Sequence, residues 1–261
     1  ILFAWRAPKV GMGGKFDLLS RESLLLANNL LLLVAAGSVL LGTLYPLIID
    51  ALGLGKLSVG PPYFEAVFVP VMTPAIFLIG IGPIARWKQM SLPTLVIRLR
   101  WAFVVSVVSA LITPYLMGEW KPIVSFGMLL AFWIIACVVV NLKHRISNGG
   151  QGNIFSKLAR QSGSYYGMHS AHLGVAVFII GVTLVSGYET EKDVRMEIGS
   201  KVTVGGYTFQ FNGVSNAPGP NYKSVMGDIT VFKGDQVYRT LNPEKRTYNA
   251  SGMAMTEAAI D

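Results

Sequence analysis

The sequence is short of charged residues, which make up only 14% of its 261 positions. A soluble domain usually carries about 25% charged residues, so this shortage argues against an ordinary globular protein. The single cysteine, Cys137, excludes a disulfide framework, a CxxC redox pair and a zinc site built from several cysteines. Disorder is excluded as well, because 52% of the residues are apolar and 11% are aromatic.

The few charges leave five long apolar stretches in residues 1–188 that contain no Asp, Glu, Lys or Arg. These stretches have 27, 20, 18, 21 and 28 residues, whereas a helix needs roughly 20 residues to cross the hydrocarbon layer of a membrane. We therefore expect a polytopic α-helical membrane protein with about five transmembrane helices. The predicted spans are 23–45, 63–85, 101–117, 122–142 and 168–187.

The net charge of +8 would also suit nucleic-acid binding, so the position of the basic residues decides its meaning. Twelve of the 22 Lys and Arg residues lie in three loops, 5–22, 86–100 and 142–167, and the two loops between these hold one each. This alternation follows the positive-inside rule and predicts that the three basic loops are cytoplasmic. Membrane lipid is thus the expected surrounding, and no nucleic-acid partner is expected.

Beyond residue 187 the sequence changes to short alternating or β-branched runs, which are typical of strands. The Gly205-Gly206 and Gly234-Asp235 pairs predict hairpin turns between some of them. We therefore divide the chain into a transmembrane helical region, 1–187, and a β-rich extracytoplasmic domain, 188–261. The expected strands are 201–204, 207–211, 227–232 and 236–240.

A domain of this length with so few strands is expected to have little core of its own. Its last segment, Pro243–Asp261, mixes charged residues with methionines. A solvated turn is the favoured interpretation of this segment, because exposed charge pairs contribute little to stability. A docking surface for a partner is the alternative, with the methionines as adaptable apolar contacts.

His172 is the most informative polar residue of the helical region. It lies inside the longest charge-free stretch, about one to two turns from a basic loop. An ionisable side chain at that depth is costly to solvate and marks a functional candidate. Neutral imidazole suits iron, and a haem held between helices needs an axial nitrogen. The alternative is a histidine that is hydrogen-bonded to a neighbouring helix, and the residues alone leave both interpretations open.

The other two histidines are weaker candidates. His169 lies three residues before His172 on roughly the same face, where it could reach a propionate, a quinone or lipid headgroups. Because it lies nearer the interface, we expect it to be solvated. His144 lies between Lys143 and Arg145 and is expected to belong to a basic interfacial cluster. A HExxH arrangement is absent, which argues against a zinc hydrolase.

Three glycines, Gly167, Gly174 and Gly181, recur every seven residues in the last predicted span. They share one helix face, so we expect another helix to approach closely there. Gly174 is also consistent with room for a flat cofactor beside His172.

Five strings of the sequence are long and unusual. They are SRESLLLANN (20–29), KLSVGPPYFEAVFVP (56–70), AHLGVAVFIIG (171–181), EKDVRMEIG (191–199) and PEKRTYNASGMAMTEAAID (243–261). These strings resemble the carboxy-terminal part of the CcmF family, which forms the large subunit of the bacterial cytochrome c maturation haem lyase, and the similarity runs over the whole chain.

The resemblance implies a multi-pass protein of the bacterial inner membrane with a periplasmic C-terminal domain. Such a protein takes substrate haem from the chaperone CcmE and attaches it to the CxxCH cysteines of apocytochrome c, together with CcmH and CcmI. The family also holds a structural haem b between two transmembrane histidines, which quinol can reduce. The histidine of the AHLG string is one of these two ligands, so the resemblance assigns His172 to the haem iron. The resemblance assigns no role to His169.

The sequence departs from the family in what it lacks. The tryptophan-rich WWD segment, two periplasmic haem-binding histidines, the second transmembrane ligand and a final span are all missing, so catalytic residues stay unassigned. We expect a piece truncated at both ends, in which Ile1–Trp5 ends an earlier span. Such a piece alone would be unable to form thioether bonds.

Two other functions are open to this sequence. The prolines Pro70, Pro74 and Pro83 interrupt the second predicted span, and proline-interrupted helices are a feature of transporters. However, the five spans show no internal similarity of the kind that an inverted repeat would leave. The second alternative is a non-catalytic assembly scaffold whose β-rich tail recruits partners.

Overall fold

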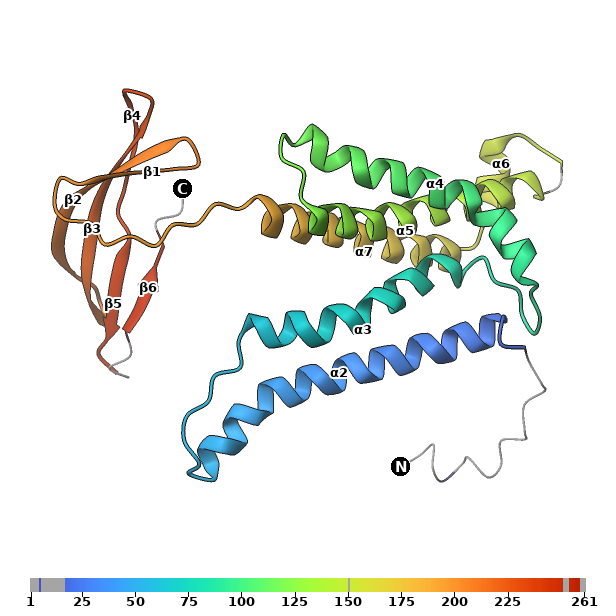
Figure 1. The fold of residues 1–261 in the computed structure, drawn as a ribbon, viewed down its shortest axis with the longest axis horizontal. Helices are drawn as coiled ribbons and strands as arrows, with labels where there is room; N and C mark the ends of the chain where they lie inside the picture. Colours follow the sequence, from blue (N-terminus) through green and yellow to red (C-terminus); the bar gives the residue numbers. More distant parts are fainter. Residues whose placement is uncertain (1–4, 6–16, 150, 251–253, 259–261) are drawn as a thin grey trace. The chain divides into compact units, whose positions relative to one another are not determined.

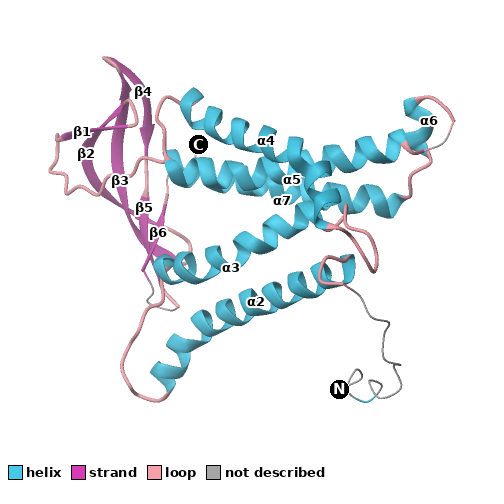
Figure 2. Ribbon diagram, turned by 45° about the vertical axis from the view of Figure 1, so that its right-hand side comes forward, coloured by secondary structure: helices cyan, strands magenta, loops and turns pink. Residues whose placement is uncertain are grey.

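The computed structural model describes Trp5 and residues 17–149, 151–250 and 254–258 (Figure 1). The chain divides into two compact units, Ile1–Gly187 and Tyr188–Asp261. The first unit is built from helices and the second from strands (Figure 2). Apart from Trp5, the opening segment that we interpreted as the end of an earlier span lies outside the described residues.

In the residues that the structure describes, the helical unit contains five helices that are long and apolar enough to cross a membrane. A short sixth helix, α6 (Ile154–Ala159), follows the fourth of them. The predicted architecture, membrane-spanning helices followed by a β-rich domain, is confirmed. The five long helices are α2 (Arg21–Ala51), α3 (Pro61–Ile81), α4 (Leu92–Leu116), α5 (Pro122–Ser147) and α7 (Gly163–Tyr188).

The helices do not end where the charge-free stretches end. The helix α4 begins at Leu92, nine residues before the predicted span, so Arg98 and Arg100 lie within its first turns. Charged residues limit the part of a helix that can lie in hydrocarbon, but they do not end the helix itself. The helix α2 likewise continues through Pro46 to Ala51. Proline removes one backbone donor, and a membrane helix can tolerate this loss.

The helix α5 lies at the centre of the unit, where it packs against α3 and α4, while α3 also packs against α2. Trp133 of α5 is buried, stacks on Phe77 with 4.6 Å between ring centroids, and donates a hydrogen bond to the Phe77 carbonyl. A Cβ atom at Gly80 would lie 2.6 Å from the Trp133 indole nitrogen, so only glycine allows this approach. Farther along, Ala176 of α7 is fully buried in a cluster with Ile134 of α5.

The second unit is an antiparallel sheet in which β3 is the central strand. One edge of β3 pairs with β2 along most of its length, and the other edge pairs with β4 and then with β5. Gly205 and Gly206 have φ angles of 60° and 82° in the β1–β2 hairpin, which is the left-handed backbone that favours glycine. The strands are β1 (Lys201–Val204), β2 (Tyr207–Pro218), β3 (Tyr222–Lys233), β4 (Gln236–Leu241), β5 (Glu244–Tyr248) and β6 (Ala254–Glu257).

The last segment of the chain forms strands, contrary to the favoured interpretation of a solvated turn. The strand β5 pairs with β3, and β6 pairs with β5. The sequence EKRTY gives no apolar alternation, so its strand character was not visible in the pattern. It is in the sheet because β3 extends beyond β4 and offers backbone donors and acceptors that need partners.

The sheet has a small core, as its length predicts. Among the described residues of this unit, only Ser224 and Val231 are buried. Both lie on β3, and the Ser224 hydroxyl donates a hydrogen bond of 2.7 Å to the Ala217 carbonyl. The ladder of backbone hydrogen bonds therefore holds more of this sheet together than apolar burial does.

We expect Val231→Ala to destabilise the sheet by about 2 kcal/mol, because it removes two buried carbons and leaves a cavity. Hydrogen exchange of β2 and β3 amides should then be about 30-fold faster. The matched control is Val237→Ala in β4, where the side chain is 64% exposed and the exchange rate should change little. Equal acceleration in both variants would show that Val231 is not the core of the sheet.

Candidate functional site

The helix α7 carries His172 on the side that faces the other helices. Successive helical residues are about 100° apart, which places His172 on the same side as Tyr165 and the fully buried Ala176. The imidazole is half-buried, and its ring centroid lies 6.4 Å from that of His169. No hydrogen bond from the described part of the chain reaches the His172 ring. An imidazole nitrogen that no protein group occupies is free to bind a metal.

The glycine stripe of α7 lies on the opposite side. Gly174 is two residues from His172, which is about 200° around the helix. A Cβ atom at Gly167, Gly174 or Gly181 would meet nothing within 4 Å. Gly174 therefore makes no room beside the His172 ring, contrary to expectation, and no helix of the described chain packs on the stripe. The expected close approach of another helix to this face stays a prediction.

His169 differs from the expectation of a solvated side chain. Only 6% of it is exposed, because this side of α7 packs on α5. Its Nε2 atom lies 3.3 Å from the Asn141 Oδ1 atom, and its Nδ1 atom is buried without a hydrogen-bond partner among the described residues. The Tyr165 ring contacts it edge-on, at 4.4 Å between centroids. His169 is thus part of the helix packing.

Asn141 of α5 joins three segments of the helical unit. Its amide nitrogen donates to the Pro83 carbonyl at 3.0 Å, and its Oδ1 atom accepts a bond from the Tyr165 hydroxyl at 3.0 Å. The same oxygen faces His169. The sequence reasoning did not single out Asn141, although the rule that identified His172 applies to it: a polar side chain in an apolar run needs a partner.

His144 belongs to a basic cluster, as predicted. Its Nε2 atom lies 2.7 Å from Arg98 Nη2 and 2.9 Å from Asn148 Nδ2. Guanidinium and amide nitrogens only donate, so Nε2 is the acceptor and the ring proton resides on Nδ1. In the described residues there is no group of three or more His, Cys, Asp or Glu that could hold a metal ion. A haem needs less, since one imidazole from a helix can serve as an axial ligand.

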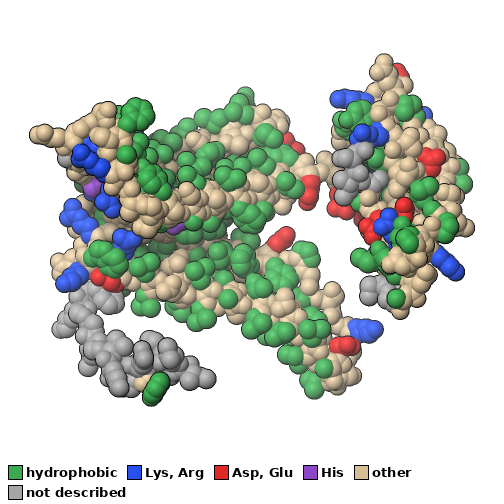
Figure 3. All heavy atoms as spheres, turned by 180° about the vertical axis from the view of Figure 1, so that it is seen from behind, with side chains coloured by type: hydrophobic (Ala, Val, Ile, Leu, Met, Phe, Trp, Pro, Cys, Tyr) green, Lys and Arg blue, Asp and Glu red, His purple; other side chains and the backbone are tan. Residues whose placement is uncertain are grey.

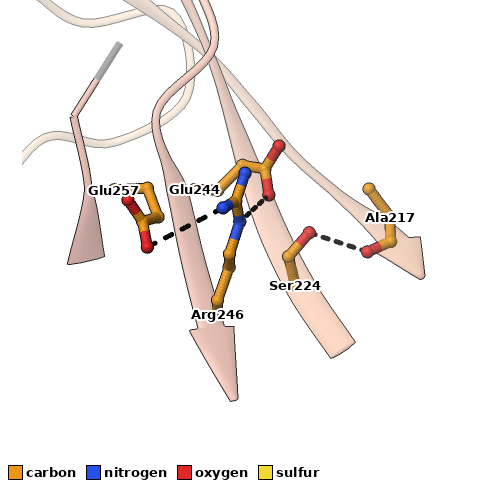
Figure 4. A network of polar contacts seen from close by, with 5 residues as sticks. All are labelled: Ala217, Ser224, Glu244, Arg246 and Glu257. Carbon is orange, nitrogen blue, oxygen red and sulfur yellow. Dashed lines mark hydrogen bonds and ion pairs between the residues drawn. The ribbon is translucent and has the colours of Figure 1, made fainter. Parts of the chain in front are cut away.

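A second polar network lies in the sheet, on β3, β5 and β6 (Figure 4). The Arg246 Nε atom donates to Glu244 at 2.8 Å, and its Nη1 atom lies 3.7 Å from a Glu257 oxygen. The Arg246 guanidinium also lies 4.5 Å from the centroid of the Tyr222 ring. These contacts tie β5 to both neighbouring strands. The alternative role of this segment, a docking surface, stays a prediction.

We expect Tyr165→Phe to destabilise the helical unit by about 1 kcal/mol, because it removes the hydroxyl that Asn141 accepts from. The measurement is chemical unfolding of the purified protein in detergent, followed by tryptophan fluorescence. Tyr166→Phe is the matched control, since the Tyr166 hydroxyl bonds the Leu158 carbonyl at an exposed position. If both variants lose equal stability, the Asn141 contact has no special weight.

The network in the sheet also predicts a dependence on pH. The hydrogen bond from Arg246 lowers the pKa of Glu244 below its ordinary value. A lowered folded-state pKa stabilises the sheet above the ordinary pKa, and this stability is lost as pH falls through the lowered value. Exchange of β5 amides, corrected for intrinsic rates, should therefore accelerate between about pH 5 and pH 3. Glu244→Gln should abolish this extra acceleration, and an unchanged pH profile would contradict the prediction.

Comparison with known proteins agrees with the resemblance. Residues 187–261 match the family model of the CcmF C-terminal beta-sandwich. Over its whole length the chain is 42% identical to the cytochrome c-type biogenesis protein CcmF of Pseudomonas aeruginosa and 40% identical to CcmF of Escherichia coli, covering 39% of each relative. The chain thus spans about two fifths of the length of these curated relatives.

A solved structure, that of the cytochrome c haem lyase CcmF, has the same fold. It superposes with a TM-score of 0.64 at 21% identity, and the match covers 92% of this chain and 38% of that chain. The five apolar helices and these relatives make the protein a multi-pass membrane protein. Over its whole length, the chain thus matches the carboxy-terminal part of CcmF proteins.

Proposed function

We propose that this chain is part of a cytochrome c haem lyase and that His172 is one axial ligand of a haem b bound in the membrane. The observation that carries the proposal is the position of His172 in a chain that matches CcmF proteins. Its imidazole is half-buried on a membrane-spanning helix, and no described residue hydrogen-bonds it. The names of the relatives favour this function over a transporter, because they are cytochrome c biogenesis proteins.

The surroundings of His172 support a ligand whose position is fixed. Tyr165 and His169, which lie two turns and one turn before it on α7, contact Asn141 of α5. These contacts hold the first half of α7 against α5, so that His172 lies at a set depth and orientation. A metal ligand needs such positioning, because groups that orient it affect affinity strongly. When bound, the haem would supply a redox-active iron.

The rest of the family's activity is proposed here for the complete protein. It would receive substrate haem from CcmE and join it to the CxxCH cysteines of apocytochrome c, in contact with CcmH and CcmI. The basic loops would face the cytoplasm of a bacterial inner membrane, and the sheet would face the periplasm. Quinol would be the reductant of the haem b. The second axial histidine and the catalytic residues would lie outside this chain.

The test is the haem content of the full-length protein with His172→Ala. Loss of a group that merely orients a metal ligand costs about 10–100-fold in affinity, so loss of the ligand should lower bound haem by at least about tenfold. The pyridine haemochrome assay measures the content, and the low-spin absorption spectrum reports the ligation. His144→Gln is the matched control, because His144 belongs to the basic cluster, and it should keep both haem content and spectrum. His169→Gln changes a residue that positions α7, so it should lose less haem than His172→Ala.

Two results would contradict the assignment. Unchanged haem content and spectrum in His172→Ala would remove this residue from the site. Loss of haem in His169→Gln, with His172→Ala unaffected, would assign the iron to the buried neighbour instead. A third result, a haem-free protein that moves a solute in liposomes, would favour the transporter.

A further inference from the structure

A cavity of about 330 Å³ opens at the end of the helical unit where α4 begins and α5 ends. It lies in the region of the basic cluster around His144. Its lining contains three arginines and three side-chain amides and has no Asp or Glu. The polar residues that line it are Arg86, Arg98, Asn141, His144, Arg145, Asn148 and Gln161.

The arginines of this cavity form no ion pair with an acidic residue of the described chain. The ion pairs between described residues involve none of Arg86, Arg98 and Arg145. Arg98 and Asn148 both donate to the neutral ring of His144. These bonds fix the side chains but leave the positive charge of Arg98 without a counter-charge. Like charges gathered without a counter-charge create a positive potential that an anion can relieve.

A second cavity, of about 200 Å³, shares part of this wall. It is lined by Pro83, Asn141 and Arg145, as the first cavity is, and it adds Arg21 of α2. The basic region around the first cavity thus continues to Arg21. Figure 3 shows Lys and Arg side chains gathered at the end of the helical unit that carries α6, while hydrophobic side chains cover its length.

Exposed apolar side chains lie on the side of α4 that carries Arg98. Trp101 and Val105 follow Arg98 by three and seven residues, which places them on roughly the same helix face, and both are exposed. A ligand that is anionic at one end and apolar at the other fits this combination of surfaces. A soluble anion would use the arginines alone and leave the apolar side chains without contacts.

We propose that this cavity binds the phosphate group of an anionic membrane phospholipid. Arginine pairs with phosphate through two parallel N–H···O bonds, which gives both strength and geometry. Basic pockets between membrane helices are suited to anionic headgroups, and here the amides of Asn148 and Gln161 can bond the remaining headgroup oxygens. The acyl chains would lie along the apolar side chains of α4.

The test uses native mass spectrometry of the full-length protein in detergent, with dioleoylphosphatidylglycerol and dioleoylphosphatidylcholine added separately. Wild type should retain the anionic lipid in preference to the zwitterionic one. Each basic residue near a membrane surface contributes about fivefold in affinity for anionic lipid, so Arg86→Gln with Arg98→Gln should weaken retention by about 25-fold. Arg98→Lys keeps the charge but loses the two parallel hydrogen bonds to phosphate, so it should weaken retention less than the double variant does.

The matched control is Arg100→Gln, two residues from Arg98 on α4. Arg100 is exposed, stacks near Trp101 and does not line the cavity, so its variant should retain lipid as wild type does. Haem content should stay unchanged in all of these variants, which separates this site from that of His172.

Three outcomes would overturn the proposal. One is equal retention of both lipids by wild type, and another is equal loss in Arg100→Gln and the double variant. The third is saturable stabilisation by inorganic phosphate in a thermal-shift assay, lost in the double variant, with no effect of phosphatidylglycerol. That result would assign the cavity to a soluble anion.

Discussion

The hydrogen bonds of the Asn141 side chain hold together the part of the molecule on which the rest depends. In an apolar surrounding a polar group costs free energy unless another group pairs with it. The Asn141 side chain supplies such a partner twice, because it donates a hydrogen bond to the Pro83 carbonyl and accepts one from the Tyr165 hydroxyl. It thereby connects the turn after α3, the C-terminal part of α5 and the start of α7, and it lines both basic cavities. The position of His172 follows from this arrangement.

The number of membrane-spanning helices could be predicted, because each of them needs a minimum length without charges to cross the hydrocarbon layer. The positions of the charged residues show where such lengths occur. The helix ends could not be predicted, since Arg98 and Arg100 lie on α4 and Pro46 lies within α2. Backbone hydrogen bonding decides where a helix ends, whereas the charge pattern reports only where lipid begins. In the sheet, Gly205 and Gly206 indicated their turn correctly, because a positive φ angle is a local property. The pairing of β5 with β3 depends on residues far apart in the sequence, which no local pattern encodes.

The candidate site likewise contains features that the sequence could predict and features that it could not. The depth of His172 in an apolar run was visible in the sequence, because it depends on the distance to the nearest charges. The environment of His169 was not, since its burial depends on which side of α7 meets α5. Gly174 was assigned to the wrong side for a related reason: nearness in sequence was taken for nearness in space. Asn141 could have been found by asking of amide side chains in apolar runs, as was asked of histidines, which group pairs with them.

The two faces of α7 differ in what they contact. One face carries His172 and is fixed to α5, whereas the face with Gly167, Gly174 and Gly181 is open in the described chain. An α-helix is stiff over this length, so it moves as one body when either face is pushed. Any element that packs on the glycine stripe would therefore alter the depth and tilt of the imidazole on the opposite side of the helix without touching it.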